Sequence, residues 1–185
     1  MNIERLLLEN NPFSRPGTPL KSVKGIVLHW VANPGTSALQ NRNYFESLKK
    51  QTLDSVGRYA SSHFIIGLDG EVIQCIPVDE MAYHVGAKLY TPEAITRLGH
   101  YPNNCTLAIE LCHPDASGEF TSATWAAAVI LCANLLHQFS LETSDLWTHH
   151  GITRKECPRR FVNHPEEFER FKAEVSDCLR SELWN

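Results

Sequence analysis

The 185-residue sequence contains no apolar run close to the roughly 20 residues that a membrane-spanning helix requires. It also has no excess of basic residues, since 17 lysines and arginines face 21 acidic residues, for a net charge of −4. Nucleic-acid-binding proteins usually carry a clustered positive surface, whereas the basic residues here are scattered along the chain. We therefore expect neither membrane insertion nor nucleic acid binding.

The N-terminus, MNIERLLLENN, lacks the basic segment and apolar segment that together mark a secretory signal. We therefore expect synthesis in the cytoplasm without a signal peptide. In that compartment thiols stay reduced, so most of the six cysteines are expected to be reduced and buried.

Length and composition predict one compact domain over residues 1–185, with 43% hydrophobic and 21% charged residues. Residues 1–20, which include PFSRPGTP, are expected to form an irregular N-terminal arm. No segment predicts a separate cell-wall-binding domain after the last helix, and we expect a monomer.

Hydrophobic patterning predicts an alternation of strands and helices. A long Pro/Gly-containing loop at residues 77–104, with a short helix near 93–98, is typical of a functional segment. Asp69-Gly70 is a strong hairpin signal. The predicted order is a strand at 23–30, a helix at 37–51, hairpin strands at 63–67 and 71–76, the loop, a strand at 106–112, a helix at 123–139 capped by Ser122, a strand at 145–148, and a helix from 164 to about Leu183. This order predicts an α/β fold in which helices flank a mixed central sheet.

Polar side chains interrupt three of the apolar segments. His29 lies near the end of GIVLHW, Glu110 lies inside TLAIEL, and THHGITRKECP combines two histidines, a lysine and a cysteine. Each has a structural explanation when taken singly: a lone histidine at a strand end is usually structural, a strand glutamate can face solvent, and a cysteine can fill a core. Their combination at strand ends, where α/β folds place their sites, favours a functional centre.

These residue types match a catalytic zinc site, which has three protein ligands of the imidazole, thiolate or carboxylate class. His29, one histidine of the 149/150 pair and Cys157 form such a set. Glu110 is suited to accept a proton from water beside the metal. Lys155, two residues before the cysteine, is suited to stabilise an oxyanion.

The segment from Val23 to Phe171 resembles the type-2 N-acetylmuramoyl-L-alanine amidases, which are zinc amidases of the peptidoglycan-recognition-protein type. The resemblance rests on IVLHW, on ASSHFIIGLDGEVIQCIPVDEMAYHVG, on NNCTLAIELC, and on His-x7-Cys-Pro in HGITRKECP. It implies the fold of that family and cleavage of the amide bond between N-acetylmuramic acid and L-alanine in peptidoglycan.

The resemblance also implies roles for single residues. His149, rather than His150, has the ligand spacing to Cys157. Lys155 matches the oxyanion-stabilising lysine and Glu110 the catalytic glutamate. Some phage relatives use a tyrosine where this sequence has Ser62, so that route is absent here.

The remaining histidines have weaker assignments. His84, in MAYHVG, matches a histidine along the substrate groove of many relatives, and either orients substrate or forms a hydrogen bond within the loop. His63 is expected to be a packing residue or a neighbour of the ligands, and His150 is expected to fix the tautomer of His149 or the loop. Four others, His100, His113, His137 and His164, are expected to be surface or structural residues.

The sequence favours a phage endolysin or bacterial autolysin that reaches the cell wall after holin release or lysis. Three other interpretations fit less well. A peptidoglycan-binding protein commonly lacks the cysteine ligand, which is present here as Cys157. A cytosolic muropeptide-recycling amidase has an aspartate ligand at a longer spacing. A purely structural zinc site usually has four protein ligands and leaves Glu110 unexplained.

Overall fold

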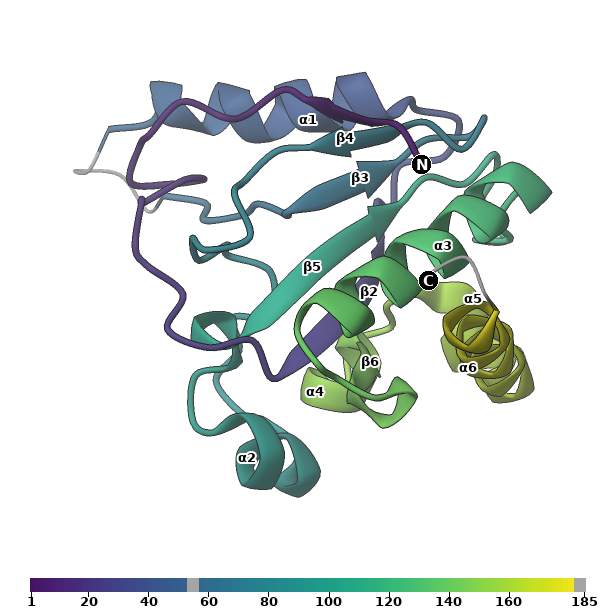
Figure 1. Ribbon diagram of the computed structural model, residues 1–185. Helices are drawn as coiled ribbons and strands as arrows, with labels where there is room; N and C mark the ends of the chain where they lie inside the picture. The colour runs from purple at the N-terminus through teal and green to yellow at the C-terminus, as the bar shows by residue number, and fades with distance from the viewer. Residues whose placement is uncertain (53–56, 182–185) are drawn as a thin grey trace.

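The computed structural model describes residues 1–52 and 57–181. Its centre is a six-stranded mixed sheet in the order β1-β4-β3-β5-β2-β6 (Figure 1). Only the β3–β4 pair among these strands is antiparallel, as expected for a hairpin. The strands are β1 Ile3–Arg5, β2 Gly25–Trp30, β3 Phe64–Ile66, β4 Val72–Gln74, β5 Thr106–Leu111 and β6 Leu146–Thr148.

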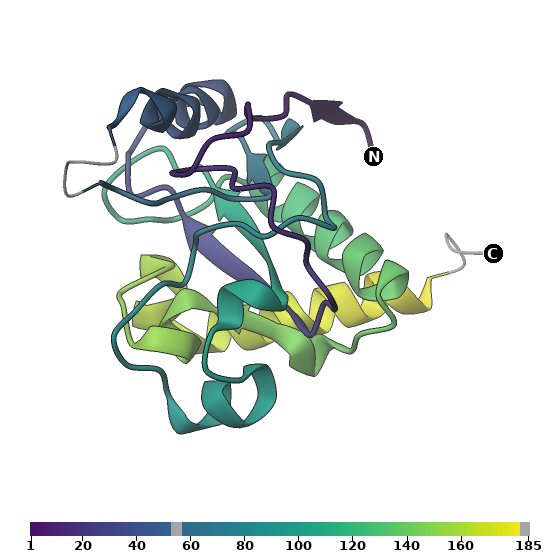
Figure 2. The ribbon, with the colours of Figure 1, turned by 90° about the vertical axis from the view of Figure 1, so that its left-hand side faces the viewer.

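Helices cover both faces of this sheet, which confirms the predicted α/β architecture. In Figures 1 and 2, α1 lies on one face, and α3 and α6 lie together on the other. The helices are α1 Ala38–Ser47, α2 Pro92–Leu98, α3 Ser122–Gln138, α4 His149–Thr153, α5 Arg159–Asn163 and α6 Pro165–Arg180, with 3-10 turns η1 Leu48–Lys50, η2 Pro102–Asn104 and η3 Thr143–Asp145.

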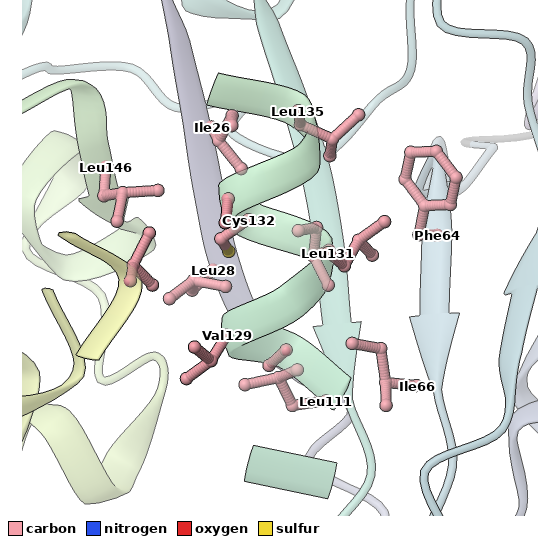
Figure 3. Close-up of a cluster of buried hydrophobic side chains, with 14 of the residues drawn as sticks. Ile26, Leu28, Phe64, Ile66, Leu111, Val129, Leu131, Cys132, Leu135 and Leu146 are labelled. Carbon is pink, nitrogen blue, oxygen red and sulfur yellow. The ribbon is translucent and has the colours of Figure 1, made fainter. Parts of the chain in front are cut away.

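The main core lies between the sheet and α3. Successive side chains in a strand point to opposite faces, so alternate residues of β2 and β5 share this core. Figure 3 shows α3 lying over β2 and β5, with the labelled apolar side chains of the helix and the strands gathered together. The buried residues include Ile26, Leu28, Phe64, Ile66, Leu107, Ile109, Leu111, Leu131, Cys132 and Leu135.

The opposite face of the sheet carries two smaller apolar clusters. One joins Phe45 and Leu48 to Ile65 and Ile73, over β3 and β4. The other joins Val27 of β2 to residues of β6, α2 and α4, including Trp147, Ala94 and Ile152. On the same face, His29 of β2 and Glu110 of β5 are polar residues near the carboxyl ends of their strands.

Local signals account well for the longer elements. The β3–β4 hairpin is confirmed, and its turn contains Gly70 at φ 83°. A Cβ at this glycine would lie 2.9 Å from the carbonyl oxygen of Ala123, so both the backbone angle and the space require glycine. The helix predicted at 123–139 is confirmed as α3, although its N-cap is Thr121 rather than Ser122, since Thr121 Oγ1 accepts from the amide of Thr124.

Three short elements, β1, α4 and α5, were not predicted, whereas the short helix near 93–98 and the strand at 145–148 are present as α2 and β6. Residues 1–20 were expected to be irregular, yet β1 pairs in parallel with β4, and the buried Leu8 and Phe13 anchor the arm. Strand β1 has only three residues, and α4 and α5 have five each, too few to show a hydrophobic period. Helix α6 ends at Arg180; the predicted end near Leu183 lies outside the described residues.

All six cysteines are unbridged thiols, and five of them are buried, as predicted. No helix within residues 1–52 and 57–181 combines the length and apolar character needed to cross a membrane.

Candidate metal centre and active site

Three polar side chains lie in one row at the ends of the parallel strands β6, β2 and β5, two of them on strands and one just after β6. His29 of β2 is in register with Glu110 of β5. On the other side Leu28 pairs with Thr148, so His149, the next residue, lies beside His29. Because residues in register on parallel strands point to the same face, these side chains lie together on the face opposite α3.

Helix α4 brings Cys157 back to this row. The helix begins at His149 and ends at Thr153, and the left-handed backbone of its C-cap Arg154, with φ 66°, turns the chain. The amide of His150 then donates to the carbonyl of Cys157 at 2.9 Å, which closes the loop. The loop thus converts the His-x7-Cys spacing into proximity.

The three predicted ligands converge. His29 Nδ1 lies 3.1 Å from His149 Nδ1 and 3.7 Å from Cys157 Sγ. All three ligand atoms lie within 4.8 Å of one another, and all three residues are buried.

This geometry fits zinc. In a tetrahedral site with bonds of about 2.1 Å to nitrogen and 2.3 Å to sulfur, two nitrogens lie about 3.4 Å apart and a nitrogen and a sulfur about 3.6 Å apart. The observed separations of 3.1 and 3.7 Å are close to these edges, and the ligand atoms of His149 and Cys157 lie within 4.8 Å of each other. A donor set of two imidazoles and one thiol is also the chemistry that zinc prefers, with a fourth position left for water.

Burial favours the neutral form of every ligand. It lowers the pKa of His149 to about 4, with a smaller contribution from the Lys155 cation, and lowers that of His29 well below its ordinary value. Burial likewise raises the pKa of the Cys157 thiol. Both imidazoles therefore hold lone pairs ready for a metal at neutral pH, whereas the thiol has to lose a proton on binding.

Glu110 presents a buried carboxyl to the same centre. The residue is partly exposed as a whole, but its Oε2 is buried and accepts no hydrogen bond within the described part of the chain. Burial raises the pKa of Glu110 to about 8, and the Lys155 cation opposes this shift. A polar atom that is buried without a partner is costly, which is typical of a group with a functional role.

Lys155 lies on the loop between α4 and Cys157 and is exposed. Its main-chain carbonyl accepts two hydrogen bonds, one from the amide of Cys157 at 2.8 Å and one from His150 Nδ1 at 3.1 Å. His150 therefore fixes the loop, one of the two roles predicted for it.

A cavity of about 740 Å³ opens over this centre. Around the predicted ligands, Glu110 and Lys155, its wall contains several aromatic side chains and further cations. These include Tyr44, Tyr59, Tyr83, Tyr101, Arg58 and Arg154. Among the described lining residues, Glu110 is the only acid.

Two histidines near the centre have both ring nitrogens engaged. His63 accepts from the amide of Ala108 at Nδ1 and lies 2.9 Å from the carbonyl of Glu80 at Nε2, which makes it the predicted packing residue. His84 lies 3.0 Å from His29 through Nδ1 and 3.0 Å from Thr106 Oγ1 through Nε2. A role for His84 toward substrate stays a prediction.

Other residues of this region behave as structural elements. Ser62, which stands where some phage relatives have a tyrosine, is fully buried, and its hydroxyl donates to the carbonyl of Phe64 at 2.9 Å. His113 is buried and stacks on Trp30 at 4.6 Å between ring centroids, while His100 and His137 are exposed.

Sequence reasoning did not identify Thr106 or Asn103 as part of the site. Asn103 Oδ1 accepts from the amides of His84 and Val85 at 3.2 and 3.0 Å. In the sequence, the only local features of these residues are that Asn103 belongs to a Pro-Asn-Asn turn and that Thr106 begins a strand. Neither indicates a long-range hydrogen bond.

In chelator-treated protein, Glu110→Gln is expected to raise the free energy of unfolding, and the gain should increase with pH. The pKa of Glu110 is about 8 in the folded state, against an ordinary value of about 4.3. Below the lower value the carboxyl is neutral in both states, and above the upper value the folded protein must hold a buried charge. The wild type therefore loses stability as pH rises through this window, and glutamine does not.

We expect almost no gain near pH 4 and up to about 5 kcal/mol near pH 9, measured by urea unfolding. The matched control is Glu4→Gln at an exposed position of β1. A gain for Glu110→Gln that is the same at every pH would contradict the assigned shift.

Comparison with known proteins places the chain in a family. The N-acetylmuramoyl-L-alanine amidase family matches residues 19–160. A probable N-acetylmuramoyl-L-alanine amidase of Bacillus licheniformis is 34% identical over 169 residues, covering 91% of this chain and 46% of the relative. The amidase BlyA of Bacillus subtilis strain 168 is 31% identical over 172 residues, covering 89% of this chain and 44% of the relative. The chain thus spans about half the length of these relatives.

Solved structures agree with this placement. A mutant endolysin from Bacillus subtilis matches with a TM-score of 0.73 at 25% identity, covering 95% of this chain and 99% of the other. The structure of PlyL matches with a TM-score of 0.72 at 21% identity, covering 95% and 97%, which shows a shared fold. The family match over most of the chain and these relatives together show that the chain belongs to the N-acetylmuramoyl-L-alanine amidase family.

Proposed function

We propose that this chain is a zinc-dependent amidase that hydrolyses the bond between N-acetylmuramic acid and L-alanine in peptidoglycan. The observation that carries the proposal is the convergence of His29, His149 and Cys157 beside the buried carboxyl of Glu110. A binding protein or a structural zinc site does not require this carboxyl. Membership of the family supplies the bond that is cut.

The three ligands would hold the metal at the base of the cavity. When bound, zinc would supply Lewis-acid chemistry, and its charge would lower the pKa of the neighbouring Glu110. Glu110 then takes a proton from the attacking water and delivers it to the departing nitrogen of L-alanine. Lys155 stabilises the negative charge that develops on the carbonyl oxygen.

The cavity lining supports a glycopeptide substrate. Arg58, Arg154 and Lys155 place positive charge around the opening, which suits the carboxylates of a wall peptide. Tyr59 and Tyr83 are in edge contact at 5.4 Å between ring centroids, and Tyr59 and Tyr101 are about half exposed. Exposed aromatic rings of this kind provide flat surfaces for sugar and peptide groups.

The decisive experiment is digestion of purified sacculi of several chemotypes, with and without chelator, followed by mass spectrometry of the new ends. We expect free L-alanine amino ends that disappear with chelator and return with added zinc. Cleavage at another bond, or cleavage that persists in chelator, would overturn the proposal. Activity on soluble muropeptides but not on sacculi would point to a recycling enzyme instead.

The biological setting that we propose is lysis or remodelling of the cell wall, as for the endolysin and autolysin relatives. Release by a holin would bring the enzyme to the wall. A monomeric state remains a prediction, which sedimentation of the purified chain tests directly.

Lys155→Ala is expected to lower the rate of amide hydrolysis by about 10²–10³-fold, because the loss of one oxyanion donor typically costs about 3–4 kcal/mol. The measurement is the initial rate of release of new amino ends from sacculi. Lys155→Arg should retain part of the rate, and Lys21→Ala, at an exposed position, serves as the matched control. A fully active Lys155→Ala enzyme would exclude this role.

A further inference from the structure

The imidazole of His84 connects a predicted metal ligand to the main chain. Its Nδ1 lies 3.0 Å from His29 Nε2, and its Nε2 lies 3.0 Å from the hydroxyl of Thr106. The same hydroxyl lies 2.7 Å from the carbonyl oxygen of Pro102. These contacts form a continuous chain from Pro102 to His29.

The direction of each hydrogen bond in this series is set by the Pro102 carbonyl at its end. A carbonyl oxygen only accepts, so the single hydrogen of the Thr106 hydroxyl is donated to Pro102. The hydroxyl oxygen then accepts from His84 Nε2–H. A neutral imidazole with its hydrogen on Nε2 has a lone pair on Nδ1, so His84 accepts from His29 Nε2–H.

This direction decides which nitrogen of His29 is free. With its hydrogen on Nε2, His29 has its lone pair on Nδ1. That nitrogen is the one that lies 3.1 Å from His149 Nδ1 and 3.7 Å from Cys157 Sγ. The opposite tautomer would place an N–H in the centre of the metal site.

The 3-10 turn η2 holds both ends of this arrangement. Pro102 supplies the carbonyl that starts the chain, and the adjacent Asn103 binds the amides of His84 and Val85. Thr106 is fully buried, and Asn103 is 1% exposed. Two segments of the long loop, one at His84 and one at Pro102–Asn104, are therefore locked together beside β2.

We propose that His84 is a positioning residue that sets the metal-binding tautomer of His29, with Thr106 and the Pro102 carbonyl determining its direction. The inference rests on the proposed zinc-dependent function. It means that the loop at residues 77–104 helps to orient a metal ligand. Partners of this kind orient a ligand imidazole and typically change metal affinity by about 10–100-fold.

The test uses two variants, Thr106→Val and His84→Leu, each of which removes a different member of the hydrogen-bond series. Valine has nearly the shape of threonine but no hydroxyl, so His84 loses the acceptor that holds its hydrogen on Nε2. We expect both variants to bind zinc about 10–100-fold more weakly than the wild type, measured by competition with a chromophoric chelator.

Two further variants separate this role from general loss of structure. Thr124→Val removes another buried threonine hydroxyl, which donates to the carbonyl of Gly67 beneath α3, and should leave zinc affinity unchanged. His84→Asn retains an acceptor near the position of Nδ1 and should recover much of the affinity. Adding Thr106→Val to His84→Asn should then have little further effect.

A second readout does not involve the metal. Long-range ¹H–¹⁵N spectra of histidine-labelled, metal-free protein distinguish the protonated from the unprotonated ring nitrogen. We expect His29 to carry its hydrogen on Nε2 in the wild type and to populate the other tautomer in Thr106→Val. Hydrogen on Nδ1 in the wild type, or zinc binding by both broken-chain variants as tight as wild type, would overturn the inference.

These outcomes differ from a failure of the proposed function. If the wild type bound no zinc or released no L-alanine ends, the amidase proposal would fail, while the tautomer of His29 would still be measurable. If the wild type were an active zinc enzyme and the variants were unaffected, only the role of His84 would fail.

Discussion

Glu110→Gln is expected to reduce amide hydrolysis by about 10²–10⁴-fold, the usual contribution of a general acid–base residue. Glutamine has nearly the same size and fills the same buried position, but it cannot accept and return a proton. Because Glu110 is not one of the three converging ligands, zinc affinity should stay close to that of the wild type. The measurements are the rate of formation of new amino ends and zinc content.

The control for this variant is Glu4→Gln, which removes an exposed carboxylate from β1 and should retain full activity. Glu110→Gln protein must also show an unchanged fold by circular dichroism. An active Glu110→Gln enzyme with zinc bound would remove this residue from the proton-transfer role, and the search for the base would move to other groups lining the cavity.

Cys157→Ser is expected to weaken zinc binding by more than about 100-fold, since even partners outside the ligand set change affinity by about 10–100-fold. The hydroxyl of serine is a much poorer zinc ligand than a thiolate, and it does not readily lose its proton. Hydrolysis should fall in parallel with zinc occupancy. Competition with a chelator and elemental analysis of the purified protein measure the effect.

Cys178→Ser provides the matched control, because Cys178 lies on α6, packed at the core on the opposite face of the sheet. It should bind zinc as the wild type does. If Cys157→Ser retained wild-type zinc affinity, the third ligand would have to be another group, and the His-x7-Cys assignment would be wrong.

The sequence was informative where a local pattern has a direct physical cause. The apolar runs of β2 and β5 and the Asp69-Gly70 turn predict the central sheet and its hairpin. A histidine and a glutamate inside apolar strands stand out because burying such groups costs free energy unless they are hydrogen-bonded, paired or bound to a metal. Together with the histidines, lysine and cysteine of THHGITRKECP, they predict a metal centre, and the family resemblance is what selects His149 over His150.

Short elements and long-range partners were not predictable in this way. Strand β1 and helices α4 and α5 are too brief for a periodic pattern, and their stability depends on contacts with the rest of the fold, such as the pairing of β1 with β4. Thr106 shows nothing unusual in sequence, because its partners His84 and Pro102 are brought together by the folding of the loop.

The sequence by itself therefore determined which side chains are available for chemistry: two imidazoles, a thiol, a carboxyl and a lysine, at spacings that indicate their family. Only the tertiary structure decided how they act together. Strand register placed His29 beside Glu110, and the end of β6 placed His149 beside His29. Burial shifted their pKa values, and a hydrogen-bond chain through His84 selected one tautomer of His29. Each of these effects depends on distances between segments far apart in the chain, which no local pattern specifies.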